Sequence, residues 1–311
     1  QIPKQVDSYI VLWKSYTTVL AMLDGCDGLR GCDYDVTASG DAWLFEICPA
    51  AKDIAVVTEQ ITVEEVLMMD VDLVFWQSPA CADLAKNLIA AGVPAVNVNF
   101  TDYESMKKSV SLTADILNTD SAKSKAEKFN QNLDETLREI GDKVDTLSEG
   151  EIVTVLNLRR LSDLRADGKD TVADTWINAC GGRNILADND LSGNQYLNLE
   201  QILEWNPDFI MSSGLGDQEE MYADEKYAGL KAVQENHVYT NPQGIFWWNR
   251  YSAETVLQLK WAAQKFHPEL FSDTDMVEET QEFYSEFFGY QISETDVNNM
   301  LQAQAPASFA G

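Results

Sequence analysis

The segment TVEEVLMMDVDLVFWQ at residues 62–77 has a near copy, NLEQILEWNPDFIMSS, at residues 198–213, 136 positions later. Each copy opens with a residue that caps helices, Thr or Asn, and carries Glu or Gln three positions on, which is the spacing of a capping box. Each copy then reaches an apolar run, residues 73–76 or 209–211, that is typical of a buried strand in a parallel sheet. Two copies of one helix–strand unit predict two similar lobes.

Other short apolar runs, separated by stretches of helical periodicity, extend this pattern along the chain. We expect further strands at residues 9–13, 95–98, 152–156 and 238–240. Strands that alternate with helices over this length predict an α/β fold with parallel sheets covered by helices, and therefore two Rossmann-like lobes. Residues 253–266 and 278–288 have helical periodicity and predict additional helices near the C-terminus.

Between the two lobes, residues 121–147 carry apolar side chains at spacings of three and four only, which is one face of a single helix. At about 1.5 Å per residue such a helix is roughly 40 Å long and forms a rigid connector. We therefore expect a first lobe over residues 1–118, a linker helix over 119–148, and a second lobe with C-terminal helices over 149–311. The ligand cleft is expected between the lobes, outside the carboxyl ends of the strands.

The composition excludes several classes of protein. The chain has 311 residues, with 22 Lys and Arg against 51 Asp and Glu, and a formal net charge of −29. Such a charge repels phosphate backbones and anionic lipid headgroups, so nucleic acid and bare membrane surfaces are poor candidate partners. With 45% hydrophobic residues, the chain is too apolar for a disordered protein. No window approaches 18 consecutive apolar residues, so we expect no transmembrane segment.

The cysteines give little information about structure. Five of them are scattered along the chain, too few for a disulfide scaffold. Cys26 and Cys32 are close enough in sequence to close one small loop, but free or buried thiols are the favoured interpretation. The sequence leaves the disulfide state of these two cysteines open.

The residues that follow the predicted strands are rich in Trp and Arg. They are Trp13, Lys14, Ser15, Tyr16, Trp76, Gln77, Arg159, Arg160, Trp247, Trp248, Asn249 and Arg250. Aromatic faces combined with Arg suit a large, partly planar ligand that bears anionic or carbonyl oxygens, although burial in the core is the alternative for each Trp. Because Arg159 and Arg160 are adjacent in an extended segment, they point in opposite directions, and we expect only one of them to face the cleft.

In four segments the chain resembles the substrate-binding proteins of ABC importers whose lobes are joined by one rigid helix, a class that serves ferric siderophores, haem, vitamin B12 and some oxyanions. The segments are the first repeat copy, the long helix, residues 168–213, which begin GKDTVADTWINACGGRNIL and end with the second copy, and residues 244–271, GIFWWNRYSAETVLQLKWAAQKFHPELF. Together they cover nearly the whole length. The resemblance implies an extracytoplasmic monomer, in the periplasm or at the cell surface as a lipoprotein, that passes its ligand to a permease without catalysis.

The resemblance also implies roles for particular residues. As in the vitamin B12 binding members, Trp76 ends the strand of the first copy and Arg250 lies before the last long helix, so both are implied ligand contacts. Other aromatic contacts of those members are not matched here, which weighs against a corrinoid. Permease docking in the family uses one acidic residue on each lobe, for which Asp83 and the pair Glu219 and Glu220 are the candidates.

Two alternatives are disfavoured by missing residue patterns. A bare transition-metal site needs several His ligands, and the chain has only His237 and His267. An enzyme is disfavoured because the sequence has no GxSxG, GxxxxGK[ST], HExxH or GxGxxG motif. A metal-cluster-binding enzyme subunit is a remote alternative, because Cys48, Cys81 and Cys180 lack the local spacing of iron–sulfur ligands.

The predicted ligand is a metal chelate, namely an iron siderophore, haem or a corrinoid. In this hypothesis Arg250 anchors the oxygens of the ligand, while Trp76 and either Trp247 or Trp248 cover its faces. A molybdate or tungstate oxyanion is the alternative within the same family. It would use Lys14, Ser15 and Thr17 at a helix start, with Arg250 opposite. We expect no catalytic residue, no cofactor and no metal held directly by protein side chains.

Overall fold

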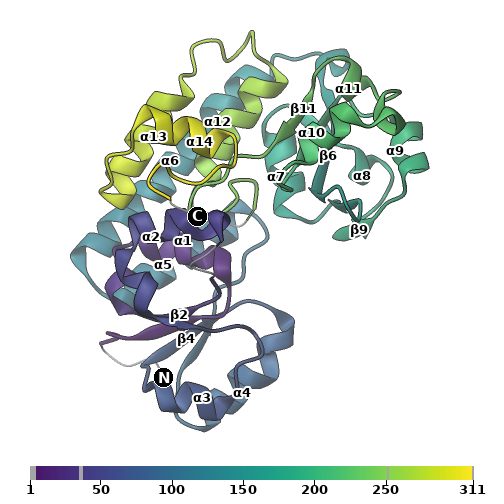
Figure 1. The fold of residues 1–311 in the computed structure, drawn as a ribbon. Coiled ribbons are helices and arrows are strands. Elements are labelled where there is room, and N and C mark those ends of the chain that lie inside the picture. The colour runs from purple at the N-terminus through teal and green to yellow at the C-terminus, as the bar shows by residue number, and fades with distance from the viewer. Residues whose placement is uncertain (1–4, 35–37, 251, 310–311) are drawn as a thin grey trace.

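The computed structural model describes residues 5–34, 38–250 and 252–309. It has two α/β lobes, the first at the bottom of Figure 1 and the second at the upper right. In the described part of the first lobe, parallel strands lie in the order β3-β2-β1-β4-β5. Their bounds are β1 Tyr9–Val11, β2 Leu29–Cys32, β3 Ala55–Val56, β4 Leu73–Trp76 and β5 Ala95–Asn97.

Helices cover both faces of this first sheet, as a parallel sheet with apolar strands requires. Figure 1 shows α1 (Thr17–Met22), α2 (Ala42–Ile47) and α5 (Tyr103–Leu117) above it, and α3 (Val63–Met69) and α4 (Ala82–Ala90) below it. Short 3₁₀ turns connect these elements at Lys14–Tyr16, Cys26–Gly28, Ser39–Asp41, Pro49–Asp53 and Pro79–Cys81.

Both copies of the repeat fold as predicted. Helix α3 begins with a capping box, in which the Thr62 hydroxyl accepts from the Glu65 N–H at 3.3 Å and the Glu65 carboxylate accepts from the Thr62 N–H at 2.8 Å. In the second copy, α9 (Leu199–Trp205) begins with the equivalent box. Each helix ends at a left-handed residue, Asp70 at φ 49° or Asn206 at φ 45°, before β4 or β10 follows. The duplication in the sequence is therefore a duplication in structure.

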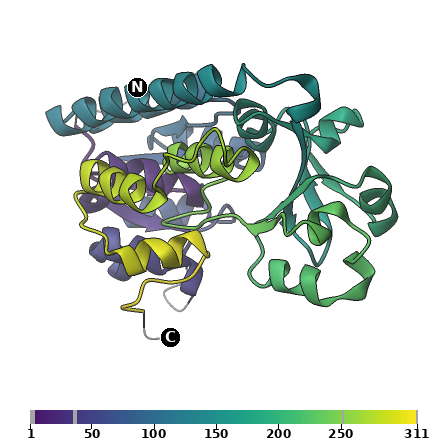
Figure 2. The same ribbon diagram turned by 90° about the horizontal axis from the view of Figure 1, so that it is seen from above.

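The predicted linker is a single helix, α6 (Asp120–Val144), which begins where Thr119 caps the N–H of Ala122 and ends slightly earlier than expected. Figure 2 shows it along one side of the molecule, from the first lobe to the second. The apolar stripe read from the sequence is its buried face, formed by Ala122, Ala126, Phe129, Leu133 and Ile140. Burial of this stripe along its length holds the connector rigid.

The second lobe has a mixed sheet, whereas the sequence analysis predicted parallel strands only. Within the described residues its order is β11-β10-β6-β7-β9, with β8 also paired to β6. After β6 the chain turns back through Leu164 at φ 47°, so β7 pairs antiparallel with β6, and β9 pairs antiparallel with β7. The strands are β6 Val153–Arg160, β7 Arg165–Asp167, β8 Gly182–Asn184, β9 Asn194–Tyr196, β10 Phe209–Ser212 and β11 Val238–Thr240. The helices of this lobe, besides α9, are α7 Val172–Ala179, α8 Ile185–Asp188, α10 Asp217–Ala223 and α11 Lys231–Gln234, with 3₁₀ turns at Glu149–Glu151 and Glu225–Tyr227.

The C-terminal helices contact both lobes. They are α12 (Thr255–Phe266), α13 (Met276–Phe283), which continues into a π-helical turn at Tyr284–Phe288, and α14 (Glu294–Leu301). Helix α12 packs against α6 and α7, while the π-helical turn packs against α1. After α14, the carbonyl of Gln304 accepts a hydrogen bond from Trp43 Nε1 of α2 at 3.0 Å. One apolar core therefore continues from the first lobe through α6 and α12 into the second.

A disulfide joins Cys26 to Cys48, with the two Cα atoms 5.6 Å apart. The suggested loop between Cys26 and Cys32 is therefore wrong, and so is the favoured interpretation of free thiols for Cys26 and Cys48. Strand β2 carries Cys32 into the buried sheet, while α2 leads the chain back so that Cys48 meets Cys26. The remaining cysteines, Cys32, Cys81 and Cys180, are buried free thiols, as predicted. No helix among the described residues has both the length and the hydropathy to cross a bilayer.

Candidate functional site

The loop between β11 and α12 lies where the two lobes meet. Its Gln243 Nε2 donates to the carbonyl of Gly40 in the first lobe at 2.7 Å. The N–H of Ala253 donates to the Thr18 hydroxyl in α1 at 2.9 Å. Because this loop carries residues 247–250 of the predicted site, the fold brings that part of the site against the first lobe.

A buried amide network attaches the same loop to the strand ends of the second lobe. Asn157 in β6 is fully buried, and its Oδ1 accepts from the Nδ2 atoms of Asn241 and Asn249, each at 3.2 Å. Asn249 Oδ1 in turn accepts from the Ser213 hydroxyl after β10 at 3.1 Å. Buried amides without partners are costly, so this mutual satisfaction fixes the loop conformation next to Arg250.

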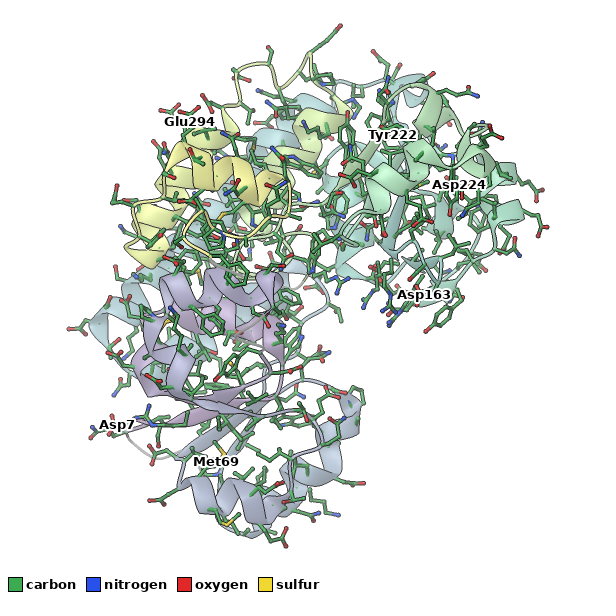
Figure 3. The ribbon with its side chains drawn as sticks, viewed as in Figure 1. Asp7, Met69, Asp163, Tyr222, Asp224 and Glu294 are labelled. Atoms are coloured by element: carbon green, nitrogen blue, oxygen red, sulfur yellow. A yellow bond between two sulfur atoms is a disulfide. The ribbon has the colours of Figure 1, made fainter. Side chains whose placement is uncertain are left out.

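Arg159 is held by a buried carboxylate. Its Nε donates to Asp167 Oδ1 at 2.7 Å, and that oxygen also accepts from Asn194 Nδ2 at 2.8 Å. The adjacent Arg160 is exposed and pairs with Asp163 at 2.7 Å. The two arginines thus have different environments, and which of them faces a ligand stays a prediction. In Figure 3, Asp163 lies at the lower edge of the second lobe, on the side that faces the first lobe.

Arg250 is a half-buried cation among other cations. Its Nε atom is buried and has no hydrogen-bond partner among the described residues. Burial is the main cause that lowers the pKa of the Arg250 guanidinium to about 10. The charges that act on it are, in decreasing order, those of Arg159, Asp167, Arg165 and Arg160, of which only the carboxylate raises the pKa. We call the four arginines 159, 160, 165 and 250 the guanidinium cluster. A cluster of this kind favours an anion.

A second buried carboxylate, Glu254, shapes the Trp-rich part of the loop. It accepts from the N–H groups of Ile245 and Phe246, each at 3.1 Å, from Trp248 Nε1 at 3.2 Å, from Ser252 Oγ at 3.0 Å, and from the Tyr284 hydroxyl. Burial raises the pKa of Glu254. Only glycine fits at position 244, because a Cβ there would lie 1.8 Å from Glu254 Oε1.

The two tryptophans of the loop, Trp247 and Trp248, differ in burial. Trp248 is fully buried and packs in the core, with its indole N–H bound to Glu254. Trp247 is half-buried. The side chain of Trp248 is therefore a support for the loop, whereas Trp247 keeps an exposed part that a ligand can contact.

The predicted residues after β1 also divide between core and surface. Tyr16 is fully buried and its hydroxyl contacts those of Ser109 at 2.8 Å and Thr113 at 2.7 Å. Trp13 is half-buried and stacks on the Tyr16 ring, with centroids 5.7 Å apart. Lys14 forms an ion pair with the buried Asp41 at 2.6 Å.

Like Arg250 Nε, two polar atoms of the first lobe are buried without a hydrogen-bond partner among the described residues. Ser15 Oγ after β1 and Trp76 Nε1 after β4 are buried and lack a partner within the part of the chain that the structure describes. Gln77, next to Trp76, donates to Asn99 Oδ1 at 2.9 Å. Unsatisfied buried donors are rare in native proteins and require an explanation. A ligand that accepts their hydrogen bonds is one such explanation.

The acidic docking candidates occupy matching positions in the two copies. Asp83 is exposed in the first turn of α4, which follows β4. Glu219 and Glu220 are exposed in the first turn of α10, which follows β10. Each copy of the repeat therefore carries acidic side chains on the helix that follows its strand.

Sequence reasoning missed three residues that organise this region. Asp167 and Arg165 lie on β7, a strand of only three residues, RAD, that has no apolar alternation to reveal it. Glu254 carried a weak signal, since it is the only acidic residue in the apolar stretch at residues 252–259. Its role depends on backbone donors of the loop, which no sequence pattern identifies.

The comparisons with known proteins agree with this architecture. A family model described as "Periplasmic binding protein" matches residues 55–244. The molybdate-binding protein MolA of Haemophilus influenzae is 20% identical over 314 residues, which cover 92% of this chain and 87% of MolA. The structure of molybdate-bound MolA has a TM-score of 0.82 at 17% identity and covers 94% of this chain and 96% of that one. A periplasmic solute-binding protein from Veillonella parvula has a TM-score of 0.82 at 22% identity, over 96% of this chain and 92% of that one.

The family model extends over more than half of the chain, from β3 in the first lobe to the loop that follows β11 in the second. This match confirms the family that the repeat, the long helix and the final loop had indicated. Members of the family are solute-binding proteins of transport systems and not enzymes. The chain therefore belongs to the periplasmic binding protein family.

Proposed function

We propose that this protein captures an anionic solute between its two lobes and delivers it to the permease of an ABC importer. The observation that carries the proposal is Arg250. Its guanidinium is half-buried, its Nε has no partner among the described residues, and neighbouring arginines oppose its charge. A bound anion would relieve that repulsion and accept a hydrogen bond from Arg250 Nε.

Among anions, we favour an oxyanion of the molybdate class. Ser15 Oγ and Trp76 Nε1 are, like Arg250 Nε, buried polar atoms without a partner among the described residues, and each is able to donate a hydrogen bond. A tetrahedral oxyanion presents several acceptor oxygens and would accept from such donors. The similarity to molybdate-binding MolA over most of both chains supports this choice.

The first-lobe contribution to such a site would differ from the one expected from sequence. Lys14 is already paired with Asp41, and the Thr17 hydroxyl donates to the carbonyl of Lys14. Ser15 is then the side chain of this turn that is left to donate to an anion. We therefore propose Ser15 rather than Lys14 or Thr17 as the first-lobe contact.

A metal chelate, such as a ferric siderophore, haem or a corrinoid, is the second candidate. The half-buried Trp13, Trp76 and Trp247 would offer ring faces to a large ligand. The guanidinium cluster also extends to the exposed Arg160, beyond what a single small oxyanion needs. We expect that the protein binds its solute without a cofactor, and we expect a monomer.

Delivery would use the acidic residues on the two helices that follow the strands of the repeat. We propose that Asp83 docks one lobe and that Glu219 or Glu220 docks the other, each against basic residues of the permease. An extracytoplasmic location agrees with the Cys26–Cys48 disulfide, because such bonds persist in oxidising compartments. Anchoring as a lipoprotein is part of the proposal and not a property of the described residues.

The test of the proposal is a titration of the purified protein with molybdate, tungstate, sulfate, a ferric siderophore, haem and a corrinoid. Isothermal calorimetry gives the Kd of each, and the fluorescence of the eight tryptophans gives an independent signal. The oxyanion proposal predicts that molybdate or tungstate binds most tightly. Tighter binding of a chelate would favour the second candidate, and binding of neither class would contradict the proposed function.

A further inference from the structure

A cavity of about 530 Å³ lies away from the residues of the proposed anion site, between the second lobe and the C-terminal helices. Its walls come from α10, β11, α12 and the end of α14, and include Glu219, Tyr222, Tyr239, Trp261, Lys265 and Gln302. Figure 3 shows Tyr222 on the upper side of the second lobe and Asp163, beside the guanidinium cluster, at its lower edge. The volume lies within the range of small-molecule sites.

Lys265 is the distinctive residue of this cavity. Its Nζ lies 5.3 Å from the centroid of the Tyr239 ring and 5.9 Å from that of Trp261. The two rings meet edge to face, with centroids 6.2 Å apart. Their faces stabilise the ammonium by cation–π interaction and hold it at the cavity wall.

Among the residues that the structure describes, Lys265 has no counterion. Burial alone lowers the pKa of its amine, with no contribution from a carboxylate. No ion pair joins Lys265 to an acid in the described ranges, although Lys260 on the same helix pairs with Glu279. In a chain with 51 acidic residues, a half-buried ammonium that faces a cavity without such a partner is suited to an anion from outside.

The surroundings restrict the kind of anion. Among the described residues that line the cavity, Lys265 is the only cation, and Glu219 lines it too. A dianion would therefore meet one favourable and one repulsive charge. The buried Trp261 and the half-buried Tyr239 provide flat apolar surface beside the ammonium. A monovalent anion with a planar apolar body matches both features.

We propose that this cavity binds a small aromatic monocarboxylate, whose carboxylate pairs with Lys265 and whose ring contacts Trp261 and Tyr239. This site is separate from the guanidinium cluster, and none of the residues assigned to the proposed oxyanion lines it. Its occupancy therefore does not depend on which solute the protein captures for transport.

Calorimetry with benzoate as the probe tests the proposal. We expect saturable one-to-one binding with a Kd in the millimolar range or below, and a Kd at least tenfold higher for Lys265→Gln, which removes the charge and keeps a polar side chain. Lys128→Gln is the matched control, because Lys128 is an exposed lysine on α6 and its loss changes the net charge equally. Molybdate should not compete with benzoate. Absence of saturable binding up to about 20 mM, or an unchanged Kd in Lys265→Gln, would overturn the proposal.

A second measurement uses the unaltered protein and so does not depend on the folding of a variant. Limited acetylation with acetic anhydride, followed by peptide mass spectrometry, reports the accessibility of each lysine amine. Benzoate should slow acetylation of Lys265 at least threefold and leave that of Lys128 unchanged. Equal rates with and without benzoate at Lys265 would contradict the site even if benzoate binds elsewhere.

Discussion

The Thr18 hydroxyl accepts a hydrogen bond from the N–H of Ala253 at 2.9 Å, across 235 positions of sequence. The same hydroxyl donates to the carbonyl of Ser15 at 2.8 Å. One side chain of α1 therefore contacts both the turn that carries Ser15 and the loop that carries Arg250. This contact joins the two halves of the proposed anion site, one from each lobe.

Replacing Thr18 with Val should destabilise the protein by about 2 kcal/mol. The substitution keeps the shape but leaves the buried N–H of Ala253 without an acceptor, and an unsatisfied buried donor costs roughly 1–3 kcal/mol. Urea unfolding followed by circular dichroism measures the free energy of unfolding. Thr18→Ser keeps the hydroxyl, so its loss of unfolding free energy should be less than half that of Thr18→Val. Equal losses in the two variants would show that the hydroxyl contact contributes nothing.

The ion pairs of the adjacent Arg159 and Arg160 should differ in their contribution to stability. Asp167→Ala removes a buried carboxylate that Arg159 and two amides share, and should lower the free energy of unfolding by about 3 kcal/mol. Asp163→Ala removes the partner of the exposed Arg160 and should cost less than about 1 kcal/mol. Chemical denaturation of both variants gives the comparison, and similar losses would contradict the burial argument.

The stability of the protein should depend on the ionisation of Glu254. Burial raises the pKa of Glu254 in the folded state above its unfolded value of about 4.3, so the folded state retains this proton at higher pH than the unfolded state does. The resulting contribution to stability is fully present below the unfolded pKa and is lost as pH rises through the folded pKa.

The measurement for Glu254 is a series of urea unfolding curves between about pH 4 and pH 7 for the wild type and for Glu254→Gln, which does not titrate. The difference in free energy of unfolding by which the wild type exceeds Glu254→Gln should shrink as pH rises. For Glu204→Gln, at an exposed position on α9, the difference from the wild type should stay constant. A wild-type advantage that grows with pH would contradict the predicted direction.

The Cys26–Cys48 disulfide should contribute about 3 kcal/mol, because it closes a loop with a sequence separation of 22 and so restricts the unfolded chain. The double variant with Ser at both positions should show this loss in the free energy of unfolding, and reducing agent should lower the stability of the wild type but not of the variant. Iodoacetamide applied to the unfolded, unreduced protein should label Cys32, Cys81 and Cys180 only. Labelling of all five cysteines would contradict the bond.

Much of the fold follows from local rules that the sequence obeys twice. The caps at Thr62 and Asn198 and the left-handed residues Asp70 and Asn206 fix where each repeated helix begins and ends. The long linker follows from its apolar spacing. In contrast, β7 and β9 are three-residue strands with polar sequences, so the antiparallel part of the second sheet depends on pairing partners that lie far away in the chain.

The rule that ligands meet the carboxyl ends of strands pointed to the loops that carry the candidate residues, and their role as a binding site stays a prediction. Whether a given side chain is free for a ligand depends on a distant partner, such as Asp41 for Lys14 or Glu254 for Trp248. Such contacts are tertiary and leave no local pattern in the sequence.

The most direct test of the proposed capture of an anion is the affinity of Arg250→Gln for whichever anion of the titration panel binds the wild type most tightly. Arg138→Gln is the matched control, since Arg138 is exposed on α6 and its replacement removes the same charge. Isothermal calorimetry should give a Kd at least tenfold higher for Arg250→Gln, about 1.4 kcal/mol, and within about twofold of wild type for Arg138→Gln. A wild-type Kd in Arg250→Gln would contradict the account.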